Sequence, residues 1–366
     1  MPVTFRLLAA GLLALFGSLS ALAADSWPLF HGNPQQTGVV VASKLPAKLG
    51  IRWKFKAEDA FESSVAVADG LVFAASMDEN VYAVDLKTGL QKWKFKGGPF
   101  KAPPSVRDGR VYVGDLDGTL FCLDAAKGTK KWDFATSAEV GGANFHGTDL
   151  LFASHDASLY CLDKDGKQRW KFKADGEIYG SVAIAGGKTF LVGCDSQMRV
   201  IDIVKGKEDS SVDLESQSGA TAAIRGDHLY VGTMRNEVRA IDWKKGTTLW
   251  TYKGKRGGQG FFSSPAVTDK FVIIGGRDKL VHCIDRKTGV AAWTFPTGDR
   301  VDSSPVIVGD RVVVGSMDSH VYVLDLATGT QVQKIAVDGA VTGSPAVVDG
   351  RVVIGTQKGT LYCLGK

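Results

Sequence analysis

Four short apolar runs separated by polar turns form a pattern that repeats along almost the whole chain. In the first copy, residues 65–67 and 71–75 flank an Asp69-Gly70 turn, a third run covers 81–84, and residues 93–95 close the copy. Short apolar runs bounded by turn residues predict an antiparallel meander of four strands. The aspartate that ends the third strand returns every 39 to 43 residues, at Asp85, Asp124, Asp163, Asp202, Asp242, Asp285 and Asp325. A nearly fixed period of this length indicates a repeat architecture.

The two ends of the repeat region complete each other. The last copy, from 344 to 364, has three strands and no closing strand, whereas 51–55 reads as a lone closing strand. Three-strand pieces begin near Ser64, Pro103, Gly142, Ser181, Thr221, Ser264, Ser304 and Ser344, and closing strands lie at Trp53, Trp93, Trp132, Trp170, Val212, Trp250, Trp293 and Val332. The counts match, so we predict an all-β fold: a single eight-bladed β-propeller of four-stranded antiparallel blades, closed by the N-terminal strand. An open solenoid is the alternative, but it would need capping repeats.

The segments before the repeats predict export. Arg6, an apolar stretch at 7–16 and the small residues at 21–23 form a signal peptide over residues 1–23, cleaved after Ala23. Residues 24–50 read as an extended arm packed by Trp27 and Phe30, followed by the propeller at 51–366. No cysteine occurs near the cleavage site, so we expect no lipid anchor. The expected location is periplasmic or secreted.

Charge and cysteines narrow the possible functions. The net charge of +5 is mild and scattered, which excludes a nucleic-acid surface. Lysines alternate with aromatic residues on the closing strands, as at 92–96, where they protect a sheet edge or, alternatively, attract anionic lipid. Among the five cysteines, Cys194 falls in a turn, and the other four occupy one repeat position where other copies have Ala or Val: Cys122, Cys161, Cys283 and Cys363. That exchange indicates a buried core position rather than disulfides. The six histidines show no zinc-site spacing, and we expect no metal.

A recurrent Asp-x-x-Thr-Gly-x-x-x-Trp motif, complete at 85–93 and 285–293, resembles the tryptophan-docking motif of PQQ-like (quinoprotein-type) propellers. The resemblance extends over almost all of the mature chain and implies that each tryptophan caps the contact between adjacent blades. The implied docking residues are Trp53, Trp93, Trp132, Trp170, Trp250 and Trp293. Two units depart from the motif, with Val212 and Val332 near the tryptophan position.

Two functions are implied by this resemblance. One is a PQQ-dependent dehydrogenase, or a subunit of one, which would hold the quinone against two adjacent cysteines and bind calcium through carboxylates. The other is a binding propeller similar to the BamB family. No two cysteines are adjacent here, and the Asp-x-Asp-Gly turns at 115–118 and 163–166 fit plain hairpins. We therefore predict a non-enzymatic scaffold without catalytic residues or cofactor, with PQQ and calcium as the alternative. The expected partners are envelope or secreted proteins, with a small ligand also open, and the chain is expected to be monomeric.

The loops that lead into the innermost strands predict the binding site, because they gather round the central channel on one face. Aligned on the repeat, one position reads Glu62, Lys101, Val140, Tyr179, Gly219, Phe262, Asp302 and Thr342. The longest loop, 253–262, adds Arg256, Gln259 and Phe261 beside this mouth. Both charges and two aromatic residues at one repeat position are typical of a mouth for a specific partner or ligand. Unselected surface would also vary in this way.

Overall fold

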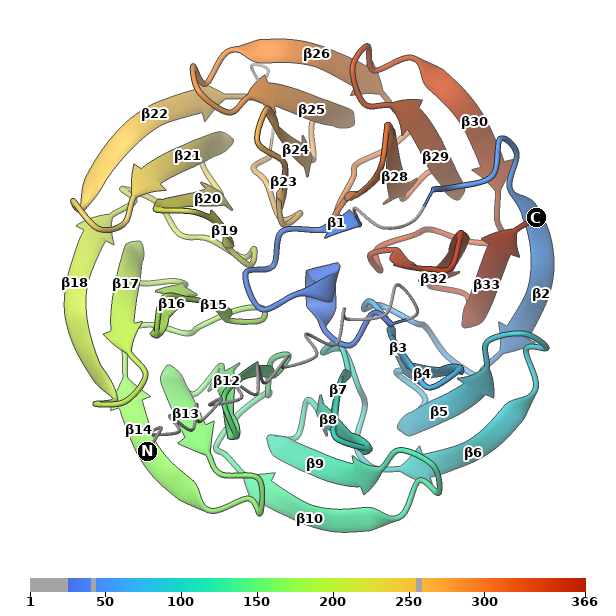
Figure 1. Ribbon diagram of the computed structural model, residues 1–366, viewed down its shortest axis with the longest axis horizontal. Coiled ribbons are helices and arrows are strands. Elements are labelled where there is room, and N and C mark those ends of the chain that lie inside the picture. The colour runs from blue at the N-terminus through green and yellow to red at the C-terminus, as the bar shows by residue number, and fades with distance from the viewer. Residues whose placement is uncertain (1–25, 41–43, 255–258) are drawn as a thin grey trace, which may run out of the picture.

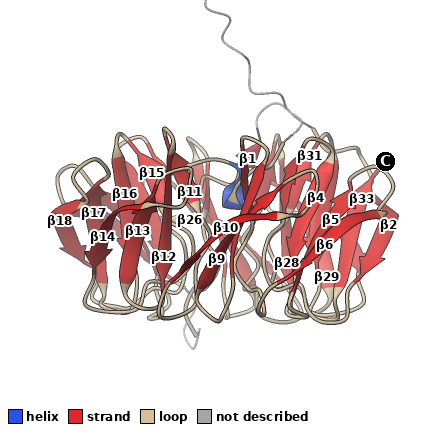
Figure 2. Cartoon of the chain, turned by 90° about the horizontal axis from the view of Figure 1, so that it is seen from below, coloured by secondary structure: helices blue, strands red, loops and turns tan. Residues whose placement is uncertain are grey.

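The structure is a computed structural model that describes residues 26–40, 44–254 and 259–366. The predicted signal peptide and its cleavage site lie outside the described residues. Eight sheets stand round a central axis (Figure 1) and form a flat disc (Figure 2). The predicted eight-bladed propeller is therefore confirmed. In the part of the chain that the structure describes, no helix is long and apolar enough to cross a membrane.

Each blade is an antiparallel meander whose strands follow one another from the axis to the rim, numbered here as blades 1 to 8 in chain order. Short strands of two or three residues line the axis, and almost entirely buried strands follow them, because adjacent blades cover both faces of each sheet. Blades 1 to 4 consist of β3 (Ala66–Ala68), β4 (Leu71–Ala75), β5 (Asn80–Asp85), β6 (Gln91–Lys96); β7 (Ser105–Arg107), β8 (Arg110–Gly114), β9 (Thr119–Asp124), β10 (Lys130–Ala135); β11 (Asn144–His146), β12 (Asp149–Ser154), β13 (Ser158–Leu162), β14 (Gln168–Lys173); β15 (Ala183–Ala185), β16 (Lys188–Val192), β17 (Gln197–Asp202) and β18 (Lys207–Asp213).

Blades 5 to 8 continue the same plan, and blade 8 receives its outer strand from the start of the chain. Blades 5 to 8 contain β19 (Ala223–Arg225), β20 (His228–Gly232), β21 (Glu237–Asp242), β22 (Thr247–Lys253); β23 (Ala266–Val267), β24 (Phe271–Gly275), β25 (Leu280–Asp285), β26 (Ala291–Pro296); β27 (Val306–Val308), β28 (Arg311–Ser316), β29 (His320–Asp325), β30 (Gln331–Ala336); β31 (Ala346–Val348), β32 (Arg351–Gly355) and β33 (Thr360–Gly365). The strand β2 (Gly50–Lys56) pairs antiparallel with β33, and Trp53 lies opposite Cys363. This pairing confirms the predicted closure.

The tryptophans near the rim dock each blade onto the next. Trp93, for example, donates its indole N–H to the carbonyl oxygen of Ala125 at 2.9 Å, and its ring covers Gly128. A methyl group on Gly128 would lie 2.6 Å from that ring, and its φ of +71° also favours glycine. The same contact joins six pairs of blades, through Trp53, Trp93, Trp132, Trp170, Trp250 and Trp293.

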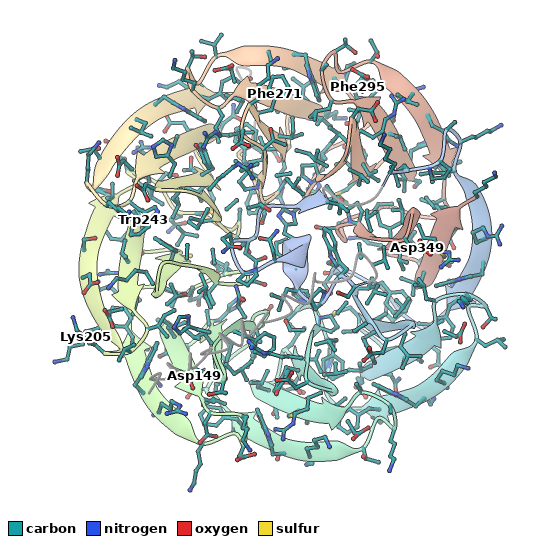
Figure 3. All side chains as sticks on the ribbon, in the orientation of Figure 1. Asp149, Lys205, Trp243, Phe271, Phe295 and Asp349 are labelled. Carbon is teal, nitrogen blue, oxygen red and sulfur yellow. The ribbon has the colours of Figure 1, made fainter. Side chains whose placement is uncertain are left out.

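The two departures from the motif have structural substitutes, and the strand register corrects their positions. A bulge in each outer pair of strands places Ser210 and Gln333, rather than Val212 and Val332, opposite the residues that face a docking tryptophan elsewhere. Between blades 4 and 5, Trp243 (labelled in Figure 3) packs on Phe190 from the opposite side. Between blades 7 and 8 there is no hairpin turn to dock on, because blade 8 is closed by separate chain ends. The amide of Gln333 instead forms hydrogen bonds to both the N–H and the carbonyl of Leu49.

Candidate functional site: a cup on the channel axis

The N-terminal arm closes one end of the central channel. It contains a short 3-10 turn, η1 (Phe30–Gly32), at the centre of the ring, and then β1 (Val39–Val40), which adds a parallel fifth strand to blade 7 (Figure 1). Extended segments flank η1, and Trp27 is buried as predicted, whereas Phe30 stays half-buried.

Backbone carbonyl groups of the arm accept hydrogen bonds from one amide in each of six of the eight innermost strands. The six amides occupy the same position in six repeats, and they donate to residues 27 to 38 of the arm: Val67 to Trp27, Val106 to Pro28, Ile184 to Pro34, Ile224 to Gln35, Val267 to Thr37 and Ile307 to Gly38. In blade 3 the backbone N–H of Phe145 donates instead to the side-chain oxygen of Asn144, whose own amide nitrogen donates to the carbonyls of Pro34 in the arm and Val182 in blade 4. The arm therefore supplies acceptors for backbone N–H groups that would otherwise be unpaired at the inner edges of the sheets.

At the other end, the channel is an open cup. The mouth has a volume of about 560 Å³ and narrows to a neck of about 160 Å³, with Phe30 of the arm among the residues that line the neck. Hydroxyl-bearing residues of successive blades surround the neck, and each accepts a hydrogen bond from the backbone N–H of the preceding blade: Thr221, Ser264, Ser304 and Ser344. The cup is thus a blind pocket whose floor belongs to the arm.

Two neighbouring positions of the loops leading into the innermost strands have opposite roles. The first is a buried anchor that packs against a glycine of the adjacent blade, as Phe61 does on Gly355 and Phe261 on Gly232. The next residue lines the mouth. Phe261 is fully buried and is therefore not beside the mouth, which corrects the prediction. Val140 is likewise the anchor of blade 3, because the loop there is one residue shorter before β11, and Gly141 lines the mouth instead.

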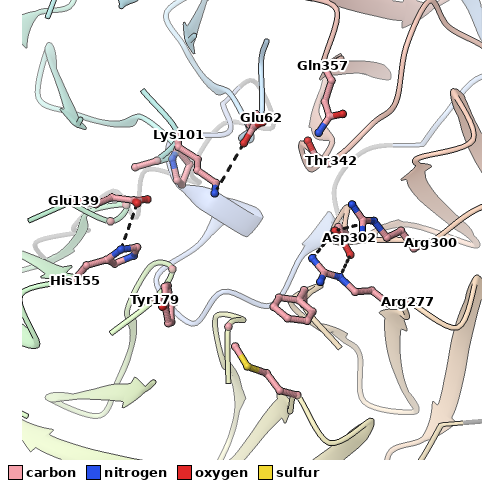
Figure 4. Close-up of a pocket in the computed structure, with 18 residues that line it drawn as sticks. Glu62, Lys101, Glu139, His155, Tyr179, Arg277, Arg300, Asp302, Thr342 and Gln357 are labelled. Atoms are coloured by element: carbon pink, nitrogen blue, oxygen red, sulfur yellow. Dashed lines mark hydrogen bonds and ion pairs between the residues drawn. The ribbon is translucent and has the colours of Figure 1, made fainter. Parts of the chain in front are cut away.

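The remaining predicted mouth residues meet in the cup. Six residues line it from six different blades: Glu62, Lys101, Tyr179, Gly219, Phe262 and Asp302, together with Thr342 of blade 8 (Figure 4). Gln259 is exposed and lines a side groove of about 300 Å³ that shares Arg277 and Arg300 with the cup. Arg256 lies outside the described residues.

Blades 1 to 3 form one wall, with a lysine–carboxylate ion pair and a histidine–carboxylate contact. The ammonium of Lys101 lies 4.0 Å from the carboxylate of Glu62, and Nδ1 of His155 lies 3.3 Å from the carboxylate of Glu139 (Figure 4). His155 also contacts the ring of Tyr179 edge-on, at 4.5 Å between centroids. The phenol of Tyr179 donates a hydrogen bond to Glu177, and this bond raises the pKa of Tyr179 above its usual range, so the hydroxyl remains protonated.

Blades 6 and 7 form the facing wall, which is tightly connected. The guanidinium of Arg277 makes a bidentate pair with Asp302 at 2.8 and 2.9 Å, and Arg300 approaches the same carboxylate at 3.7 Å. Arg277 also stacks on Phe262, with its guanidinium carbon 3.5 Å from the ring centroid. A bidentate pair and a cation–π contact fix the planes of both groups, so this wall is rigid.

Sequence reasoning missed a second ring of cup residues, which comes from the turns between the second and third strands. In all eight blades, the backbone N–H of one turn residue donates to the carbonyl of the residue two positions before the mouth position: Met77, Leu116, His155, Cys194, Met234, Arg277, Met317 and Gln357. His155, Met234, Arg277 and Gln357 of this ring line the cup, as do Glu139 and Arg300 of the accepting residues. Aligning the second turn of each repeat, as the first loop was aligned, would have found them.

Cys194 of this ring is half-buried in its turn, and the other four cysteines are free and buried in the blades, as predicted. Burial raises the pKa of these four thiols, to about 11 for Cys122 and Cys363 and about 12 for Cys161. The buried cysteines are therefore inert core residues.

Comparison with known proteins places the chain in a family. The family described as outer membrane protein assembly factor BamB matches residues 40–144, 135–260 and 234–366. Among solved structures, BamB from Moraxella catarrhalis is similar with a TM-score of 0.73 and 18% identity, covering 87% of this chain and 98% of that one. No individually curated protein matches.

Quinoprotein enzymes share the fold as well. The quinohemoprotein alcohol dehydrogenase from Comamonas testosteroni aligns with a TM-score of 0.81 and 13% identity over 93% of this chain and 80% of that one. A europium-containing methanol dehydrogenase aligns at 0.80 and 12% over 94% and 99%. Likeness at these identities shows the propeller fold alone, whereas the family match extends from residue 40 to the last residue. The chain therefore belongs to the family of outer membrane protein assembly factor BamB.

Proposed function

We propose that this protein is a non-enzymatic binding propeller of the cell envelope, whose cup receives part of a partner polypeptide. One observation carries the proposal: a tryptophan packed on a glycine recurs at six of the eight junctions between blades, whereas the side chains that line the cup differ widely in charge, size and polarity from blade to blade. A rigid, blind pocket with both charges and aromatic surface is suited to recognition. Membership in the BamB family supports an envelope location and protein partners.

The cup does not fit the quinone and calcium of the related enzymes. Its three carboxylates belong to different blades, and each already has a cationic or histidine partner: Glu62 has Lys101, Glu139 has His155, and Asp302 has Arg277. No group of three or more metal-ligating side chains occurs among the described residues. The cysteines stand in separate blades, so no adjacent pair exists to hold a quinone. We therefore derive no reaction step through that cofactor.

Affinity capture from the native envelope tests the proposal. The cup variant replaces Glu62, Tyr179, Phe262 and Arg277 together with alanine. The rim variant, which replaces the exposed Lys87, Lys127, Lys205 and Lys287 on the opposite face with alanine, is the matched control. We expect wild type and the rim variant to retain the same partners by mass spectrometry, and the cup variant to lose at least one of them while remaining folded.

Retention of every partner by the folded cup variant would move the binding site away from the channel. A parallel calorimetric titration of the wild-type chain with PQQ and calcium tests the enzyme alternative. Tight, stoichiometric uptake of the quinone would overturn the proposal.

A further inference from the structure

Opposite walls of the cup carry opposite net charge. The wall from blades 1 to 3 has two carboxylates, Glu62 beside the ammonium of Lys101 and Glu139 beside the imidazole of His155, so it has one negative charge in excess with a neutral imidazole. In the wall from blades 6 and 7, Arg277 and Arg300 share one carboxylate, that of Asp302, so an excess positive charge remains. Blades 2 and 6 lie across the axis in an eight-bladed ring, and Figure 4 shows the two groups on opposite sides of the pocket.

The surfaces between the charged walls also differ. Tyr179, Met234 and Phe262, from blades 4 to 6, offer apolar area on one side, whereas Thr342 and Gln357 of blade 8 are polar and uncharged. An occupant with charges at two ends would therefore place its apolar side chains toward blades 4 to 6. The orientation of the occupant in the cup would thus be set by the fixed order of the blades round the ring.

The neck supplies hydrogen-bond donors below the mouth. The hydroxyl oxygens of Thr221, Ser264, Ser304 and Ser344 accept from backbone N–H groups, and each side chain is at least 94% buried. Among the residues that the structure describes, none of these four hydroxyl groups donates its own proton to a protein acceptor. Buried hydroxyl donors need acceptors, and a peptide carbonyl is a suitable one.

The volume of the cup suits a short chain segment. Four extended residues span about 13 Å, because each adds about 3.3 Å, and the mouth of about 560 Å³ lies within the volume range of pockets for ligands of that size. The side groove lined by Gln259, Arg277, Lys279, Asp299, Arg300 and Met317 continues outward from the cationic wall. A chain that crosses the cup can leave along this groove.

We propose that the cup binds a short extended peptide segment with a cationic group against Glu62 and Glu139, an anionic group against Arg277 and Arg300, and an apolar side chain on Phe262. This inference rests on the proposed function and names the chemistry of the partner. A free chain terminus and an exposed loop of a partner protein present the same groups, so the experiment separates these two sources.

Calorimetric titration of the purified chain uses tetrapeptides with two central residues, leucine and phenylalanine, that stay constant. The dipolar peptide has lysine first and glutamate last, and two controls have lysine or glutamate at both ends. Each peptide is used with free termini and with acetylated and amidated termini, which mimic a terminus and a loop. We expect the dipolar peptide to bind at least tenfold more tightly than either like-charged peptide.

Single substitutions assign each end of the peptide to its wall. Arg300→Gln should weaken binding of the dipolar peptide at least fivefold but leave unchanged a peptide with glutamine in place of the glutamate. Glu139→Gln should likewise weaken binding of the dipolar peptide but leave unchanged a peptide with glutamine in place of the lysine. Such non-additivity reports a direct contact. Lys205→Gln, on the opposite face, is the control and should change nothing.

Equal binding of dipolar and like-charged peptides, or no binding of any of them at millimolar concentration, would overturn the inference. So would an unchanged affinity of the dipolar peptide for Arg300→Gln and Glu139→Gln. In either case the proposed function stands if the cup variant still loses a captured partner, and both fall together if that variant retains every partner.

Discussion

The two ends of the central channel are built from the same eight repeats, yet their chemistry differs. At the arm end, six blades present the same backbone amide at the same repeat position, and one extended segment accepts all six hydrogen bonds. At the cup end, the blades present glutamate, lysine, glycine, tyrosine, phenylalanine, aspartate and threonine at equivalent positions.

This difference separates structural from recognition positions within a single chain. A backbone amide is indifferent to side-chain identity, so the arm end holds the ring together without constraining sequence. The side chains that line the mouth contribute little to the ring, because they reach into an open pocket and pair mostly with one another. Substitutions at the two ends should therefore affect different properties, stability at the arm end and binding at the cup end.

Removal of the arm should have the largest effect. A chain that starts at Lys44 lacks all six acceptors and the buried side chains of Trp27 and Leu29. Six hydrogen bonds at about 1 kcal/mol each give a loss of about 6 kcal/mol in the free energy of unfolding, before the apolar burial is added. Denaturant unfolding followed by tryptophan fluorescence measures this loss. Gln35→Ala changes an exposed side chain of the arm and is the control, and an unchanged midpoint in the shortened chain would contradict the comparison.

The docking tryptophans near the rim are a second position that recurs from blade to blade, and Trp93→Ala tests their contribution to stability. The substitution removes a buried indole from Gly128 and leaves the carbonyl of Ala125 without its donor. The expected loss is about 3–5 kcal/mol in the free energy of unfolding. Val332→Ala, which truncates an exposed side chain on β30, should change it by less than about 0.5 kcal/mol. Similar losses in the two variants would mean that docking at the rim is not specific to the tryptophan position.

The arm end should also make stability depend on pH through His31. Burial lowers the pKa of His31 from its usual 6.5 to about 4, and its Nδ1–H donates to the carbonyl of Gln36. Because the folded-state pKa is the lower one, the unfolded chain binds more protons between pH 6.5 and 4. Stability is therefore full above about pH 6.5 and is lost as the pH falls toward 4, by up to about 3 kcal/mol.

His31→Asn isolates this contribution, because asparagine keeps a donor and tolerates the positive φ of 54° at this position. Melting temperatures between pH 4 and 8 should fall less steeply at low pH in the variant than in wild type. Parallel profiles for the two proteins would show that His31 is not held neutral by the arm.

Charge removal in the cup should have the smallest effect on stability. Lys101→Gln and Arg300→Gln each remove a partly exposed cation from a pair at 4.0 or 3.7 Å. Such pairs contribute about 0–1 kcal/mol, so the melting temperature should stay within a few degrees of wild type. A large drop in either variant would assign the cup a structural role and weaken the contrast between the two ends.

The sequence predicts the fold well because its repeat is regular enough for the blades and their closing strands to be counted. Period, closing strand and docking tryptophans all follow from positions that packing keeps uniform, such as Gly128 under Trp93. The same alignment predicts most of the mouth, including Glu62 and Asp302. It fails at Val140 and Phe261, because a shift of one residue decides whether a side chain is an anchor or lines the pocket.

Other features leave no signal in an alignment of side chains. The route of the arm depends on its backbone carbonyl groups, which are the same for every residue type. Gln333 replaces a tryptophan only because the ring closes beside it, and this requires knowing that Leu49 lies there. The bulge that moves the docking position from Val332 to Gln333 is likewise visible only in the strand register.

The closure of the ring by β2 sets the order in which the chain can complete its fold. The partner of this strand, β33, is the last strand of the sequence, so β2 is synthesised long before the strand with which it pairs. The arm has the same difficulty, since its carbonyl groups need strands from blades 1 to 7. Contacts at such sequence separation make folding slow. Until β2 and β33 pair, the edge of each strand is open to wrong pairing. A refolding experiment should therefore show aggregation that depends on protein concentration. An added peptide of residues 50–56 should reduce this aggregation, because it can pair with the open edge of β33.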